Sequence, residues 1–324
     1  MKTLKILAVV LLLGLIGVGK NANAQQDAAY SMYMFNGLYL NPAYAGSKEF
    51  VSVRAIYRHQ WTGFEGAPRT ASFAIHTPFK QNQYAAGLWF TTDHLGVTDM
   101  NSIYGSFAYR FQLPKGIKLS LGLQAGVTVY NSNLPEATII DPADQTFAVA
   151  RKLGVPNFGF GIYAYNKRWY AGFSIPHLIN SSLNEKLHNA ATEPVARQWK
   201  HYLLTAGVVI GKEESVVKFK PSFLYKAVKN TPPSIDLNFA FLFIDRLWLA
   251  AGYRIGGDAD KPVGESIIGM VEFKVTPQLN IGYAYDANLT ALSNFNSGTH
   301  EIMVGYDFGF ERKRFVTPRY VRYF

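Results

Sequence analysis

The residue types that most often carry out catalysis or bind metals are scattered along this sequence. It has seven histidines, no two of them at the spacing of a metal site, and no cysteine, so neither disulfides nor thiolate ligands contribute. Asp258 and Asp260 lie beside two glycines and faintly resemble a calcium-binding loop, but a solvated turn is the simpler interpretation. We therefore expect no catalytic residue, no metal site and no cofactor, and we expect that the protein is not an enzyme.

Charged side chains are placed more regularly. The segments described below alternate between two kinds of residue, and many charged side chains share one of the two sets of alternate positions, which we call a parity. The basic members are Arg54, Arg58, Lys118, Lys218, Lys220 and Lys226. The acidic members are Asp236, Glu272, Asp286, Glu301 and Asp307. A wet inner wall with balanced charge is the favoured interpretation. The alternative is a basic lumen that grips an acidic segment of a client or of the chain's own N-terminal part.

The segment 297–310 shows which kind of element must position these side chains. Its apolar and aromatic residues, with His300, fall on one parity, and small or polar residues fall on the other. Side chains of a strand alternate between faces, so this segment is predicted to be a strand with one apolar face. About a dozen residues exceeds the ~5–6 of a common strand and suits a tilted membrane crossing.

The same alternation recurs from residue 50 onward. It predicts strands at 50–59, 69–79, 83–93, 100–112, 116–130, 156–166, 168–176, 199–211, 215–227, 233–244, 246–256, 264–275, 277–287 and 298–310. The connections between them are alternately long and short, which is typical of a membrane barrel with long outer loops and short periplasmic turns. We therefore predict an all-β fold, a transmembrane antiparallel β-barrel of about 14 strands, with both ends of the mature chain in the periplasm.

Composition agrees with a barrel in the outer membrane. Charged residues make up 17% and aromatic residues 15%, and the mean hydropathy is zero without a long apolar run after the first residues. In residues 1–24, Lys2 and Lys5 precede a short apolar run and an Ala-Asn-Ala site, which predicts a signal peptide. The net charge of +10 is modest, and we expect contact with outer-membrane lipid but not with nucleic acid.

The barrel domain, 50–310, is predicted to be too wide for its own side chains to fill. Fourteen strands at ~4.8 Å spacing and ~40° tilt give a radius of roughly 13–14 Å. The lumen must then be an open pore or hold a partner or part of the chain, and the turn-rich N-terminal segment 25–49 is a possible plug. The candidate residues for plugging or partner docking are Asn41, Pro42, Tyr44, Gly46, Arg58, Gln60 and Trp61.

A basic, aromatic tail, 311–324, follows the last predicted strand. Arginine and aromatic side chains are enriched in binding hot spots, so this tail is a candidate for docking in the periplasm. The candidate docking residues in it are Arg312, Arg314, Phe315, Arg319 and Tyr320.

Several motifs in the sequence resemble one known family. Residues 30–36 (YSMYMFN), 41–46 (NPAYAG) and 58–64 (RHQWTGF) are similar to the N-terminal signature of the PorP/SprF family, and 298–303 and 314–320 resemble its last strand and tail. The resemblance implies an outer-membrane barrel of the type IX secretion system. It also implies roles in secreting or anchoring large surface adhesins, gliding motility in some species, and contacts with periplasmic ring and lipoprotein components.

Two functions follow from these observations. The favoured one is a non-enzymatic barrel that helps to secrete or anchor surface adhesins and links them to the periplasmic machinery. The alternative is a passive outer-membrane channel for small solutes.

Overall fold

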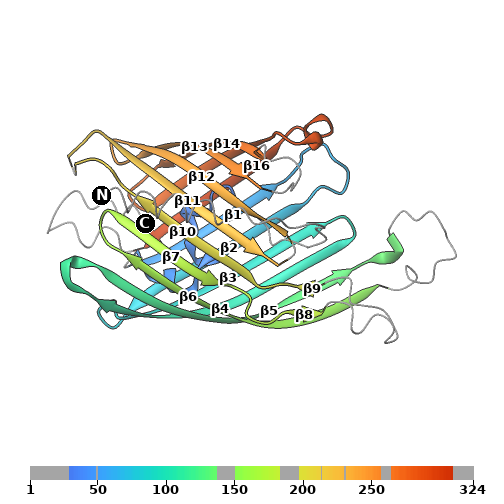
Figure 1. The fold of residues 1–324 in the computed structure, drawn as a ribbon, viewed down its shortest axis with the longest axis horizontal. Coiled ribbons are helices and arrows are strands. Elements are labelled where there is room, and N and C mark those ends of the chain that lie inside the picture. The colour runs from blue at the N-terminus through green and yellow to red at the C-terminus, as the bar shows by residue number, and fades with distance from the viewer. Residues whose placement is uncertain are drawn as a thin grey trace, which may run out of the picture.

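Fourteen strands form one closed antiparallel barrel in the described part of the chain (Figure 1). The computed structural model describes residues 29–48, 50–136, 150–182, 197–212, 214–229, 231–256 and 264–308. The barrel strands are β1 (Val51–His59), β2 (Arg69–Phe79), β3 (Tyr84–Leu95), β4 (Thr98–Gln112), β5 (Lys118–Ser132), β6 (Arg151–Tyr165), β7 (Trp169–Ile175), β10 (His201–Val208), β11 (Val217–Val228), β12 (Thr231–Phe243), β13 (Leu247–Ile255), β14 (Ser266–Lys274), β15 (Leu279–Asn288) and β16 (Thr299–Phe308). The predicted fold class is confirmed.

The barrel closes where the first strand pairs with the last. β1 pairs with β2 on one side and with β16 on the other, from Val51 opposite Phe308 to His59 opposite His300. We call this β1–β16 junction the seam. The loop end of the barrel is the end where β1 stops and β2 starts, and the turn end is the opposite one.

Side chains on the two faces of the wall differ in the way that the alternation predicted. On the outer face Leu123 is 60% exposed and Phe241 is 42% exposed, whereas Ser120 and Asn238 on the inner face are buried. An apolar outer face is stable when it contacts lipid, while the inner face keeps its polar groups away from lipid. Within the described residues, no helix is long and apolar enough to cross a membrane.

Three connections at the loop end differ from the prediction. Only residues 96–97 separate β3 from β4, and only 229–230 separate β11 from β12, so the expected strict alternation of long and short connections is wrong at these two places. The expected loop 177–198 contains a two-stranded hairpin, β8 (Ser181–Ser182) paired with β9 (Arg197–Gln198). At the first two places backbone pairing continues beyond the apolar stretch on which the boundaries were based, whereas β8 and β9 form a separate small sheet.

The N-terminal segment forms short helical turns inside the barrel. They are η1 (Tyr33–Phe35), α2 (Gly37–Leu40) and η2 (Pro42–Tyr44). The other short turns are η3 (Pro114–Gly116), η4 (Leu134–Glu136) and η6 (Ala291–Asn294). The predicted signal peptide 1–24, the tail 311–324 and parts of three outer loops, 137–149, 183–196 and 257–263, lie outside the described residues; the last of these contains Asp258 and Asp260.

Candidate functional site

Residues 29–48, which we call the luminal segment, cross the interior of the barrel from the loop end to the turn end. Ala29 and Tyr30 line a pocket with Thr91 and Asp93 near the loop end of β3. At the other end, the carbonyl of Ala45 accepts a hydrogen bond from Arg110 near the turn end of β4. In Figure 1 the blue turns of this segment lie within the ring of strands.

The luminal segment packs against opposite walls. Leu38, Ala43 and Tyr44 share a buried apolar cluster with residues of β2, β3, β4, β6 and β7. Met32 and Tyr33 belong to a second cluster, with residues of β1, β10, β11, β14, β15 and β16. The segment therefore spans the width of the lumen, and its own apolar side chains supply the filling that a barrel of this size needs.

Glu301 on β16 holds the start of the segment. Its carboxylate accepts hydrogen bonds from the backbone N–H of Ser31 at 2.6 Å and of Met32 at 2.9 Å, and it also pairs with the guanidinium of Arg58. Arg58 donates a further hydrogen bond to the Ser31 hydroxyl, which in turn donates to Asp286. Hydrogen bonds to a buried charged group are worth more than neutral ones, so this carboxylate is a strong anchor.

Around Glu301, a row of buried ion pairs follows the inner wall from the seam to β11. Arg58 lies 3.8 Å from Asp286, and Arg254 contacts both Asp286 at 3.1 Å and Asp236 at 2.8 Å. Lys226 ends the row, 3.8 Å from Asp236. Removing one member of such a buried set leaves an uncompensated charge, which is strongly destabilising.

A separate buried pair crosses the seam nearer the turn end. Arg54 on β1 donates to both carboxylate oxygens of Asp307 on β16, at 2.8 and 3.1 Å, and the Ser52 hydroxyl donates to Asp307 as well. This pair ties the first strand to the last, and the charge of Lys48, the last residue of the luminal segment, also acts on Asp307.

Asn41 fixes the middle of the segment to the opposite wall. Its amide nitrogen donates to the carbonyls of Ile162 on β6 and Phe173 on β7, while its amide oxygen accepts the N–H of Ala43. The hydroxyl of Ser174 donates to the Leu40 carbonyl at 2.6 Å. The Asn-Pro turn is thus fitted into the barrel wall, with Pro42 at the start of η2.

Glycines on the inner face make room for this turn. A Cβ atom at Gly161 would lie 2.0 Å from the Asn41 amide oxygen, and one at Gly122 would lie 2.2 Å from the Ala43 nitrogen. Distances this short are not compatible with any side chain. Glycines therefore leave the inner wall without side chains at the places where the segment's backbone approaches it.

Near the turn end, Gly46 redirects the segment toward β1. It has a φ of +67°, which favours glycine, and its N–H donates to the imidazole Nδ1 of His76. A Cβ atom there would lie 2.5 Å from the Cβ of Ala85. Both the backbone conformation and the close wall require glycine at this position.

A tyrosine hydroxyl of the segment also bonds the wall. The Tyr33 hydroxyl accepts a hydrogen bond from Asn238 at 2.8 Å. The contacts of the segment described above use neutral hydroxyl, amide and backbone groups, whereas the ammonium of Lys48, its last residue, interacts with the charge of Asp307.

Residues 29–48 contain no aspartate or glutamate, whereas Asp27 and Glu49 lie outside the described residues, so a basic lumen that grips an acidic segment of a client or of the N-terminal part stays a prediction. In the described contact the acidic group belongs to the wall: Glu301 accepts hydrogen bonds from backbone N–H groups of the segment. The favoured interpretation expected acids and bases to balance on this face, and in the structure several of them form buried pairs around the segment.

Most of the candidate residues at the N-terminal side come together in the lumen. Asn41, Pro42, Tyr44 and Gly46 belong to the segment, and Arg58 contacts it through Ser31. Gln60 and Trp61 lie apart from them, in the connection between β1 and β2, where the Trp61 N–H donates to Thr299. The tail residues Arg312, Arg314, Phe315, Arg319 and Tyr320 lie outside the described residues.

Sequence reasoning missed the link between Glu301 and the segment. Glu301 is 270 residues from Ser31 in the chain, and no local pattern connects the two. The signal that was present is the set of glycines on the inner parity of β5, β6 and β7, which indicates a close backbone neighbour. In the described ranges, no group of three or more His, Asp or Glu is arranged to hold a metal ion.

Comparison with known families decides what kind of protein has this filled barrel. The model of the family described as type IX secretion system membrane protein PorP/SprF matches residues 22–306. The chain belongs to the PorP/SprF family. The match includes the luminal segment and every barrel strand up to Tyr306 in β16, so the family predicted from the motifs is confirmed.

Solved structures that resemble this PorP/SprF chain are distant. A Pseudomonas aeruginosa FadL homologue has 12% identity and a TM-score of 0.41, over 80% of this chain and 89% of that one. The Acinetobacter baumannii outer membrane protein Omp33 has 9% identity and a TM-score of 0.42, over 80% and 98%. At these values no functional conclusion follows from them, and no curated protein matches the sequence.

Membership of the PorP/SprF family and the lipid-compatible outer face together support an outer-membrane location. They also support a general role in type IX secretion and contact with other components of that system.

Proposed function

We propose that this protein is a closed outer-membrane barrel that helps to secrete or anchor large surface proteins, adhesins among them, and links them to periplasmic components of the type IX machinery. It binds its partners and catalyses no reaction. In species that glide, the same link would couple the adhesin to movement. The family match supports the secretion role, and the filled lumen supports the closed barrel.

One observation favours this proposal over a passive channel for small solutes. The luminal segment is bonded to the wall at Glu301 near the loop end, at β6 and β7 in the middle, and at His76 and Arg110 near the turn end. A path for solutes would require this segment to leave, and every one of these contacts would then be lost.

Conductance of the purified full-length protein in a planar bilayer tests the closed state. We expect no steady conductance from the intact chain and a large one after deletion of residues 26–36, which removes the part held by Glu301. A steady, large conductance from the intact protein would show that it is a channel instead. A deletion variant that stays closed would assign the closure to the remaining part of the luminal segment, 37–48, or to the outer loops.

The predicted tail, 311–324, tests the link to the periplasm. Truncation after Phe310 keeps all the described strands, so we expect normal barrel levels in the membrane. We also expect loss of co-purifying periplasmic components and loss of adhesin display at the cell surface. If partners and display persist, the tail does not couple the barrel to the machinery; if the barrel fails to assemble, the tail belongs to the fold.

A further inference from the structure

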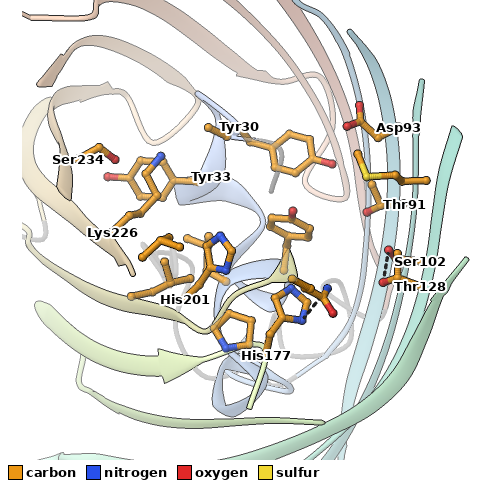
Figure 2. A pocket seen from close by; sticks show the side chains of 18 of the residues that line it. Tyr30, Tyr33, Thr91, Asp93, Ser102, Thr128, His177, His201, Lys226 and Ser234 are labelled. Carbon is orange, nitrogen blue, oxygen red and sulfur yellow. Dashed lines mark hydrogen bonds between the residues drawn. The ribbon is translucent and has the colours of Figure 1, made fainter. Parts of the chain in front are cut away.

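A pocket remains at the loop end of the lumen, above the part of the luminal segment that fills the barrel (Figure 2). Its empty volume is about 1080 Å³, including open solvent. Residues of the segment, among them Tyr30, Tyr33 and Tyr39, line it from one side. β3, β4 and β5 form one wall, and the opposite wall comes from β10, β11 and β12 with His177 and Gln198 of the connection after β7.

Aromatic rings form a continuous platform in this pocket. Tyr39 contacts the ring of Tyr30 at 4.9 Å and the ring of Trp89 at 5.2 Å, both edge to face. Trp89 is itself stacked on Tyr104, with 4.5 Å between ring centroids and 11° between planes. The platform is therefore rigid, and Tyr39 remains only half-buried beside the pocket. Rigid rings with a polar edge bind ligands that have both an apolar face and polar groups.

The polar groups of the pocket are mostly uncharged. Serine and threonine hydroxyls line both walls, with Ser102 and Thr128 on β4 and β5 and Thr231 and Ser234 on β12. A hydroxyl both donates and accepts, so it suits a ligand whose groups do the same. Figure 2 shows Ser102 and Thr128 bonded to each other on one side of the pocket and Ser234 on the other.

The charged groups of the pocket nearly balance. Asp93 on β3 faces the pocket while accepting a hydrogen bond from Thr70 at 2.6 Å, and Lys226 on the opposite wall lies 3.8 Å from Asp236. The His201 Nδ1 is 3.0 Å from the carbonyl of Trp199, to which it donates. One carboxylate and one paired ammonium do not select a strongly charged ligand.

We propose that this loop-end pocket is a saccharide-binding site that takes a short pyranose oligosaccharide. The apolar face of a sugar ring would stack on the half-buried Tyr39, which the buried rings of Tyr30 and Trp89 hold in place, and the sugar hydroxyls would exchange hydrogen bonds with Asp93 and Ser102. A half-enclosed pocket with aromatic lining and a few placed polar groups is the usual form of such a site. This inference does not depend on the proposed secretion role.

The test is binding of the purified full-length barrel to a glycan array in detergent. The array carries three arms: free neutral and acidic pyranose oligosaccharides, core oligosaccharide stripped of lipid from the cell's own lipopolysaccharide, and O-linked glycopeptides with their unglycosylated peptides. We expect binding to glycans and not to the bare peptides. The arm that binds most strongly identifies the source as a free sugar, a lipid-linked glycan or a glycoprotein.

Two variants and a matched control locate the site. Met100→Trp places a large ring in the pocket from β4, so we expect it to abolish binding. Ile103→Trp is the control, because Ile103 is 47% exposed on the outer face of the same strand, and its binding should be unchanged. Asp93→Asn keeps the shape and removes the charged acceptor, and we expect about tenfold weaker binding.

Folding of each variant is checked by its mobility shift on heating in a denaturing gel, so that loss of binding is not confused with loss of the barrel. Absence of glycan binding, equal binding by Met100→Trp, or stronger binding of the bare peptides would overturn the saccharide assignment. None of these results bears on whether the barrel is closed or binds secretion partners, so the proposed function is tested independently of the saccharide site.

Discussion

Replacing Glu301 with glutamine should release the luminal segment while leaving the barrel intact. Glutamine has the same shape, but it lacks the charge that pairs with Arg58 and one of the two oxygens that hold the N–H groups of Ser31 and Met32. Its amide N–H₂ would then face a backbone donor. The side chain is 1% exposed, so water does not replace the lost contacts.

The expected magnitude follows from the buried position. Breaking a buried ion pair by removing one partner costs about 3–5 kcal/mol. Arg58 keeps Asp286 at 3.8 Å, which places the loss at the lower end of this range. A loss of about 3 kcal/mol from the docked state corresponds to a roughly 100-fold larger population of the released segment.

Labelling of a single cysteine measures that population, because the natural chain has none. Met32→Cys places the thiol in the anchored part of the segment, where the native side chain is 0% exposed. We expect a maleimide to label this thiol roughly 100-fold faster in the Glu301→Gln background, provided that release is rapid compared with labelling.

Asp307→Asn is the matched control for this experiment. It breaks the other buried pair that crosses the seam; Asp307 bonds Arg54 and Ser52 and interacts with the charge of Lys48, which lies at the opposite end of the luminal segment from Met32. Labelling should stay slow in this background. Equal acceleration in both backgrounds would mean that loosening the seam, and not release from Glu301, exposes the segment; no acceleration in either would refute the anchoring role.

Three further outcomes are expected. Gly161→Ala should displace the segment and speed the same labelling, because its Cβ would lie 2.0 Å from the segment's asparagine, whereas Gly269→Ala, which has nothing within 4 Å, should have no effect. Phe241→Arg should destabilise the folded barrel by about 2–4 kcal/mol and so lower the folded yield in vesicles; an unchanged yield would mean that this face does not contact lipid. On intact cells an impermeant maleimide should label Asn133→Cys at the loop end and not Lys212→Cys at the turn end, and the reverse result would invert the orientation of the barrel.

The wall of this barrel was predictable from the sequence because its signal is local. Alternation with a period of two identifies a strand and both of its faces from about ten neighbouring residues, without knowledge of the partner strand. The prediction was therefore correct for Phe241 and Leu121 on the outer face and for Asp236 on the inner face. Strand ends at 96–97 and 229–230 were less predictable, since pairing there continues after the apolar residues stop.

The contents of the lumen were decided only by the tertiary structure. The Asn-Pro turn at Asn41 was visible as a turn, but its partners, the carbonyls of Ile162 and Phe173, lie 121 and 132 residues away. Glu301 could be assigned to the inner face from its parity, whereas its bonds to Ser31 and Met32 exist only because the barrel closes around the segment. Local periodicity shows which face a side chain occupies, and only the closed wall brings together the groups that meet inside it.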